Sequence, residues 1–115
     1  MKITIRESGK TETLSILDPD GTDFAVEFIR STGALDDGQF DYEEESGTWT
    51  CSQDTYNKWA QVIRDNELLD TRLPALNRKY GTKTVNKVIG AAGNCRPEDF
   101  ARTINSALDE AFGKQ

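Results

Sequence analysis

The stretch TWTCSQDTYNKWAQVI (residues 48–63) places two different apolar periodicities side by side. In its first part Trp49 and Cys51 alternate with threonines, a pattern typical of a half-buried strand. After Ser52, a residue type that often caps the N-terminus of a helix, apolar side chains recur at the spacing of one helix face: Tyr56, Trp59, Ala60 and Ile63. The stretch therefore predicts a strand that leads directly into an amphipathic helix, with Trp59 in the core.

Toward the N-terminus, the same alternation predicts two β-hairpins. QFDYE (39–43) and TWTCS (48–52) form one pair around the turn EESG, and KITIR (2–6) and TETLSIL (11–17) form the other. Thr22 is predicted to cap a helix that follows the N-terminal hairpin of residues 2–17. The order strand–strand–helix thus occurs twice, which indicates either an internal repeat or a chance similarity of two amphipathic units.

Toward the C-terminus, the apolar spacing predicts helices only. Pro74 is expected to interrupt the helix that follows Ser52, and Gly81 to end it. Thr82 is predicted to cap the next helix, and Pro97 to lie in the first turn of the last one. These patterns predict a single α+β domain over residues 1–115: two β-hairpins forming an antiparallel sheet with packed helices, and a helical C-terminal part.

Charge is distributed unevenly along the chain. Residues 1–70 contain 16 acidic and 6 basic side chains, a net charge of −10, whereas residues 71–115 contain 4 acidic and 8 basic ones, a net charge of +4. An asymmetry of this kind is typical of a protein with a charged partner. Folding can also mix the two signs on one surface, so the sequence leaves open whether the acidic part and the basic part are separated in space.

The residue types exclude several kinds of chemistry. The chain has no histidine, and its two cysteines, Cys51 and Cys95, lack the spacing of a metal or redox motif. Ser-His and Cys-His catalytic pairs are therefore excluded, and no metal or other cofactor is expected. The N-terminal sequence has no secretory signal pattern, and no apolar stretch is long enough to span a bilayer. Any catalysis would have to use carboxylates, Lys, Tyr or a bare cysteine. We expect a cytoplasmic protein that is not an enzyme.

Six acidic side chains fall within ten residues around the hairpin predicted at residues 39–52: Asp36, Asp37, Asp41, Glu43, Glu44 and Glu45. A metal site requires carboxylates that converge on one ion, whereas consecutive residues of a strand and turn diverge. General acid–base catalysis requires a desolvated carboxyl group, and nothing in this pattern indicates burial. Two interpretations remain: a solvated hairpin tip, or a surface that binds a basic partner as a run of phosphates does.

Basic side chains lie along the predicted helices of segment 72–102. Four of them flank the expected helix–Gly–helix junction: Arg78, Lys79, Lys83 and Lys87. In a helix-turn-helix protein such residues contact phosphates while the second helix enters the major groove. The other interpretation is a solvated helix face, which the net charge of −6 favours because nucleic acid repels a negative protein.

The hairpin EESGTW (44–49) leading into SQDTYNKW (52–59), in a short acidic chain without histidine, resembles proteins carried by phages and mobile elements, anti-CRISPR proteins among them. The resemblance implies a compact acidic binder that occupies the nucleic-acid groove of a CRISPR effector nuclease. It assigns no role to any individual residue of this chain.

Together, these observations predict a non-enzymatic protein-binding module. We expect an inhibitor whose acidic surface, made by the six acidic residues between 36 and 45, docks on a basic, nucleic-acid-binding groove of a partner protein. The second hypothesis is direct nucleic-acid binding by segment 72–102. The third, which ranks last, is an enzyme with carboxylate chemistry. These sequence features do not indicate an oligomeric state.

Overall fold

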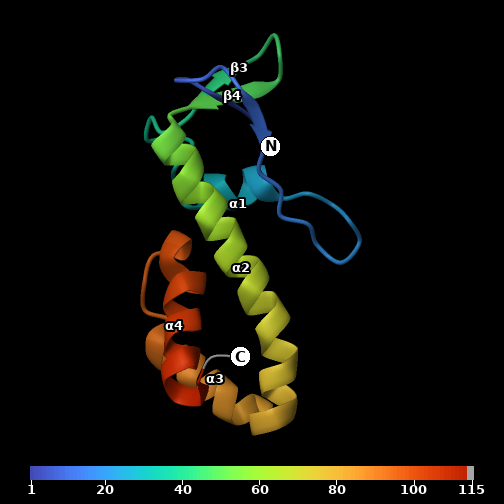
Figure 1. Ribbon diagram of the computed structural model, residues 1–115, viewed down its shortest axis with the longest axis vertical. Helices are drawn as coiled ribbons and strands as arrows, with labels where there is room; N and C mark the ends of the chain where they lie inside the picture. Colours follow the sequence, from blue (N-terminus) through green and yellow to red (C-terminus); the bar gives the residue numbers. More distant parts are fainter. Residues whose placement is uncertain (114–115) are drawn as a thin grey trace. The chain divides into compact units, whose positions relative to one another are not determined.

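The computed structural model describes residues 1–113, which form two compact units: a sheet unit, Met1–Ile63, and a helical unit that begins at Arg64. The chain is α+β with a helical C-terminal part, as predicted, and the long helix α2 belongs to both units (Figure 1). In chain order the elements are β1 (Lys2–Ile5), β2 (Thr11–Thr13), α1 (Ala25–Ser31), β3 (Asp41–Glu43), β4 (Thr48–Cys51), α2 (Gln53–Tyr80), α3 (Thr82–Ala92), the 3-10 turn η1 (Pro97–Asp99) and α4 (Phe100–Phe112).

The sheet has the strand order β2-β1-β4-β3 and is mixed. Both predicted hairpins are present and antiparallel, but they join through a parallel pair of β1 and β4. The prediction of an entirely antiparallel sheet is therefore wrong. β1 and β4 lie at the centre because they carry the buried side chains Ile3, Ile5 and Cys51, each at most 3% exposed, whereas the edge strands are short and mostly polar.

The two strand–strand–helix segments do not pack as equivalent copies. β1 is the first strand of its hairpin and β4 is the second strand of its own, yet these two strands meet at the centre of the sheet. The helices that follow also differ, since α1 has 7 residues and α2 has 28. The order of elements recurs, but the packing gives no support to an internal repeat.

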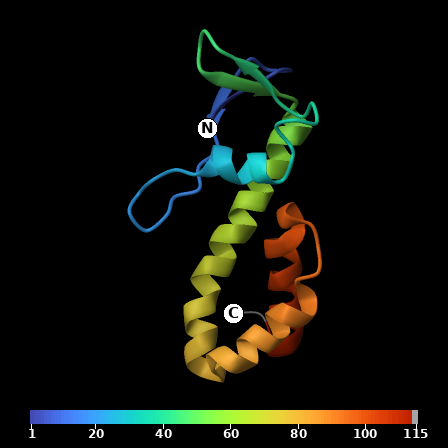
Figure 2. The same cartoon turned by 180° about the vertical axis from the view of Figure 1, so that it is seen from behind.

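The core of the sheet unit lies between one face of the sheet and the helices α1 and α2 (Figure 2). Its fully buried side chains come from all of these elements: Ile3 from β1, Cys51 from β4, Ile29 from α1 and Trp59 from α2. Trp59 is thus a core residue, as predicted. The other face of the sheet is mainly polar, because the strands alternate apolar and polar side chains.

The two helices of the sheet unit start differently with respect to the predictions. Ser52 caps α2 as predicted, since its Oγ accepts a hydrogen bond of 3.1 Å from an amide in the first turn. The predicted cap of α1 at Thr22 is wrong. The Thr22 hydroxyl donates instead to Asp20 Oδ1 (2.7 Å), and the helix starts later, at Ala25, whose amide donates to Asp23 Oδ1 (3.0 Å). Local side-chain hydrogen bonds in the loop compete with helix formation and delay its start.

The predicted break at Pro74 does not occur, and α2 (Gln53–Tyr80) runs through it. Proline lacks an amide donor, so the carbonyl of Asp70 loses its partner within the helix. Pro74 and Asp70 are both exposed, so water can satisfy that carbonyl. The buried side chains of Leu69 and Leu76 hold the flanking turns in the core.

In the helical unit, α2 from Arg64 onward, α3 and α4 enclose a second apolar core (Figure 2), which contains Leu69, Leu76, Val85, Ala101, Ile104 and Leu108. Gly81 ends α2 as predicted, with a φ of +89° that favours glycine. The predicted cap at Thr82 is wrong, because α3 begins at that residue directly after the glycine and no side chain caps it. Pro97 opens η1, the turn before α4.

Candidate functional site

The predicted acidic surface lies on the β3–β4 hairpin and in the loop before it. Asp41 and Glu43 belong to β3, Glu44 and Glu45 lie in the turn, and all four are exposed. The Asp41 carboxylate contacts Arg6 Nη2 at 3.3 Å, and the Glu43 carboxylate accepts hydrogen bonds from neighbouring hydroxyl groups. Within residues 1–113, the carboxylates of Glu44 and Glu45 have no ion pair or hydrogen bond. The tip of the hairpin therefore presents carboxylates that are available to a partner.

The charge asymmetry of the sequence follows the division into units. The sheet unit contains 13 acidic and 5 basic side chains, a net charge of −8, whereas residues 64–115 contain 7 acidic and 9 basic ones, a net charge of +2. The acidic hairpin is thus part of a unit that is negative as a whole. Its field attracts basic groups at distances where single contacts are not yet formed.

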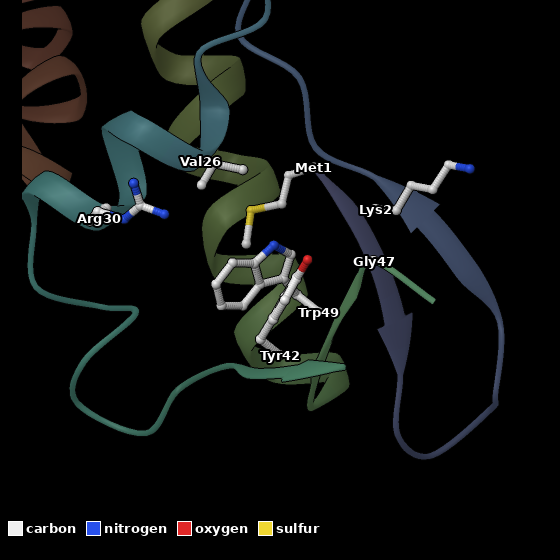
Figure 3. Close-up of a pocket in the computed structure, with 7 residues that line it drawn as sticks. All are labelled: Met1, Lys2, Val26, Arg30, Tyr42, Gly47 and Trp49. Atoms are coloured by element: carbon white, nitrogen blue, oxygen red, sulfur yellow. The ribbon is translucent and has the colours of Figure 1, made fainter. Parts of the chain in front are cut away.

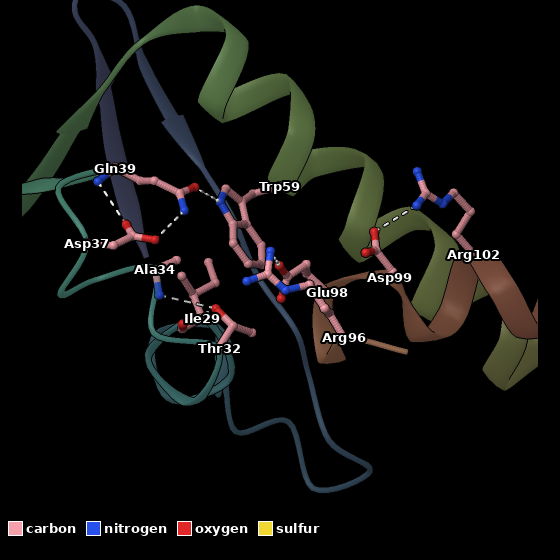
Figure 4. A network of polar contacts seen from close by, with 10 residues as sticks. All are labelled: Ile29, Thr32, Ala34, Asp37, Gln39, Trp59, Arg96, Glu98, Asp99 and Arg102. Atoms are coloured by element: carbon pink, nitrogen blue, oxygen red, sulfur yellow. Dashed lines mark hydrogen bonds and ion pairs between the residues drawn. The ribbon is translucent and has the colours of Figure 1, made fainter. Parts of the chain in front are cut away.

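Asp36 and Asp37 lie in the loop that leads into β3, and they differ in their contacts. Asp37 accepts hydrogen bonds from the amide (3.2 Å) and from the side-chain Nε2 (2.8 Å) of Gln39, and Gln39 Oε1 accepts one from Trp59 Nε1 (3.1 Å) (Figure 4). Asp37 therefore orients the group that satisfies the buried indole, a structural role that the sequence did not reveal. The exposed Asp36 carboxylate has no such contact in the described part of the chain.

The predicted basic residues lie where α2 meets α3. Arg78 and Lys79 are in the last turn of α2, and Lys83 and Lys87 lie one turn apart on α3. All four are exposed, and in the described range none of them forms an ion pair. Lys79 Nζ lies 5.3 Å from the ring centre of Tyr80, a cation–π distance that leaves its charge accessible.

The other basic residues of segment 72–102 form ion pairs within the helical unit, and one of them is buried. Arg72 is 7% exposed, donates to the backbone and side-chain oxygens of Asn105 (both 3.2 Å), and lies 2.8 Å from Asp109 Oδ1. It is therefore part of the core and is not available to phosphates. Two further pairs, Arg96 with Glu98 (3.6 Å) and Arg102 with Asp99 (2.8 Å), are visible in Figure 4.

A pocket that the sequence analysis missed lies on the helix-facing side of the sheet, beside the β3–β4 turn (Figure 3). Its volume is about 500 Å³. Tyr42 and Trp49, paired across the hairpin, form an aromatic wall with ring centres 4.6 Å apart. Met1 and Val26 contribute apolar surface, and Arg30 of α1 supplies a guanidinium group. The directly opposed positions of the two aromatic residues on the predicted hairpin were the signal that could have indicated it.

The loop between β2 and α1 holds two acidic groups with altered protonation. Hydrogen bonding with Asp18 and Thr22 lowers the pKa of Asp20. Partial burial raises the pKa of Asp23, but hydrogen bonds from two backbone amides and from the N-terminal ammonium of Met1 outweigh it and lower that pKa overall. Asp20 accepts hydrogen bonds from within the loop, and Asp23 accepts them from Ile16, Ala25 and the N-terminus, so the role of both carboxylates is structural.

The two cysteines are free thiols, with Cys51 buried and Cys95 half-buried. Burial raises the pKa of the Cys51 thiol, which disfavours the reactive thiolate. Across residues 1–113, no three acidic or cysteine side chains converge in a way that could hold a metal ion.

No protein-family model matches the chain, and comparisons with curated proteins and with solved structures find no match. In the described range, no helix combines the length and the apolar character needed to cross a membrane.

Proposed function

We propose that this chain is a non-enzymatic binding protein whose acidic hairpin docks on a basic, nucleic-acid-binding groove of a partner protein and thereby inhibits it. The observation that carries the proposal is the hairpin tip, where exposed carboxylates follow one another and Glu44 and Glu45 have no partner within the described residues. Such a succession imitates the negative charge of a phosphate backbone, and a groove built for phosphates is complementary to it.

The surrounding surface supports the same function. Because the sheet unit has a net charge of −8, it steers the hairpin toward a basic groove and is repelled by nucleic acid itself. The resemblance to anti-CRISPR proteins makes a CRISPR effector nuclease a candidate partner. The exposed charges contribute little to folding, so they are free to serve binding.

The test uses two variants with the same net charge. One carries Glu43→Lys, Glu44→Lys and Glu45→Lys at the hairpin; the control carries Glu67→Lys, Asp70→Lys and Glu110→Lys at exposed positions of the helical unit. Both raise the net charge from −6 to 0, so a difference between them reports position and not total charge. Each protein, with the wild type, is used to capture partners from a nuclease-treated bacterial lysate.

We expect the wild type and the control variant to capture the same nucleic-acid-binding protein, and the hairpin variant to lose it. Added heparin should release the partner, as should high salt, because the Debye length falls from ~10 Å at 0.1 M to ~3 Å at 1 M. A partner that stays bound to the hairpin variant, or that resists heparin, would contradict docking through these carboxylates.

A second candidate function is nucleic-acid binding by Arg78, Lys79, Lys83 and Lys87, favoured by the observation that these four exposed cations have no acidic partner in the described range. Fluorescence anisotropy with a labelled duplex tests it. Replacing Lys83 and Lys87 by Gln should weaken binding at every sequence and reduce the salt slope by about 2. Absence of binding by the wild type at low salt would rule this function out.

A further inference from the structure

The pocket beside the β3–β4 turn combines an aromatic wall with two cationic side chains, Lys2 and Arg30. Tyr42 is 51% exposed, an unusual state for a large ring on the core-facing side of a sheet. Its neighbour Trp49 is half-buried, and the two planes meet at 49°, which leaves ring surface open to the pocket (Figure 3). A flat apolar ring that enters the pocket would bury surface that water now contacts.

Arg30 determines which ligand charge the pocket favours. Its guanidinium group lies on the α1 side of the pocket (Figure 3), and within residues 1–113 it forms no ion pair or hydrogen bond. The described residues that line the pocket include no acidic side chain. Lys2 also borders the pocket, but its side chain points away from the aromatic pair. Arg30 is therefore the group positioned to contact a ligand.

A guanidinium fork matches a carboxylate with two parallel hydrogen bonds. The sheet unit as a whole is negative, but a group in contact with Arg30 responds mainly to this nearest charge, since salt screens the others over about 8 Å. A volume of about 500 Å³ lies in the range of small-molecule sites. It accommodates one or two fused rings with a carboxylate.

We propose that this pocket binds a small aromatic carboxylate, with the ring against Tyr42 and Trp49 and the carboxylate on Arg30. The site is separate from the carboxylates of the hairpin tip, so the inference does not depend on the function proposed above. No covalent step is involved, and the ligand leaves unchanged.

Three naphthalene derivatives of the same size test the charge preference: 2-naphthoate, neutral 2-naphthamide and cationic 2-naphthylmethylammonium. Each is titrated into the full chain labelled with ¹⁵N, and the two indole N–H signals are followed. Trp49 lines the pocket, whereas Trp59 is fully buried in the core, so Trp59 serves as an internal control for folding. We expect saturable shifts of the Trp49 signal with 2-naphthoate, about tenfold weaker binding of the amide and none of the cation.

Two variants and a matched control complete the test. Arg30→Gln should weaken 2-naphthoate binding about tenfold and leave the affinity for the amide unchanged, while Tyr42→Ala should weaken both. Arg6→Gln, an exposed arginine on the opposite face of the sheet, should change neither. Because Arg30 has no partner to lose in the described chain, its variant is expected to fold even if Tyr42→Ala does not. Equal binding of all three probes, an unchanged affinity in Arg30→Gln, or shifts that do not involve Trp49 would overturn the proposal.

Discussion

The indole nitrogen of Trp59 donates a hydrogen bond of 3.1 Å to Gln39 Oε1, which ties the largest fully buried side chain of the protein to the loop before β3. Gln39 is in turn held by Asp37. The same loop leads into the acidic hairpin, so the packing of the core fixes the point from which the hairpin projects.

Replacing Gln39 by Leu should destabilise the sheet unit. The change leaves the buried indole donor without an acceptor, which costs about 1–3 kcal/mol. Urea unfolding followed by tryptophan fluorescence measures the free energy. In the control Gln53→Leu, the lost contact is an exposed one with Asn57, and the change should stay below about 0.5 kcal/mol. Equal losses of unfolding free energy in the two variants would show that the Gln39–Trp59 hydrogen bond stabilises the protein no more than an exposed contact does.

Trp59→Ala and Trp49→Ala should differ strongly in stability. Trp59 is 0% exposed, and truncation of a buried tryptophan typically costs ~3–5 kcal/mol through lost burial and the cavity left behind. Trp49 is half-buried beside the open pocket, so its truncation should cost clearly less. Denaturation midpoints followed by circular dichroism make the comparison. Similar midpoints for the two variants would contradict the assignment of Trp59 to the core.

Arg72→Leu should destabilise the helical unit although leucine fits its apolar surroundings. The variant leaves the oxygens of Asn105 without their donor and the carboxylate of Asp109 without its ion-pair partner. We expect a loss of about 1–3 kcal/mol, because Asp109 is partly exposed and retains some water. Arg102→Leu, which breaks an exposed pair with Asp99, should cost ~0–1 kcal/mol. Urea unfolding measures both losses. A larger loss of stability in Arg102→Leu than in Arg72→Leu would be incompatible with a buried role for Arg72.

Asp23 should make the stability of the protein vary with pH in the acidic range. Its pKa is lower in the folded chain than in the unfolded one, so the unfolded state binds its proton first as pH falls. The stabilisation is complete above the unfolded value of 3.8 and disappears as pH falls through the lower folded value. Asp23→Asn should therefore be less stable than the wild type at neutral pH, and its stability should fall less steeply than that of the wild type as pH decreases. The control is Asp36→Asn. If the stability of Asp23→Asn fell as steeply with decreasing pH as that of the wild type, the role of Asp23 would be contradicted.

Cys51 and Cys95 should react with a thiol reagent at different rates. Cys51 is 0% exposed and its pKa is raised, so little thiolate is accessible in the native state, whereas Cys95 is half-buried in a loop. With 5,5′-dithiobis(2-nitrobenzoate) at about pH 8, we expect one thiol to react at once and the second only after denaturant is added. Cys95→Ser identifies the fast thiol. Rapid labelling of Cys51 in the native protein would show that the strand opens readily.

Several features could be predicted from the sequence because they depend on neighbours along the chain. The alternation around Trp49 and the helical spacing around Trp59 record the periodicity of a single element, and the cap at Ser52 and the stop at Gly81 are local hydrogen-bond and backbone effects. The exposure of the acids at the hairpin tip follows in the same way, since a turn rich in glutamate stays in water.

Other features depended on contacts between segments far apart in the sequence, and only the tertiary structure decided them. The parallel pairing of β1 with β4 follows from which strands bury their side chains together. The use of Asp37 to hold Gln39, the burial of Arg72 against Asn105 and the pocket between α1 and the hairpin are likewise non-local. A single element's pattern shows which face is apolar, but not which side chain will lie against it, because that depends on the packing of all the elements in a unit together.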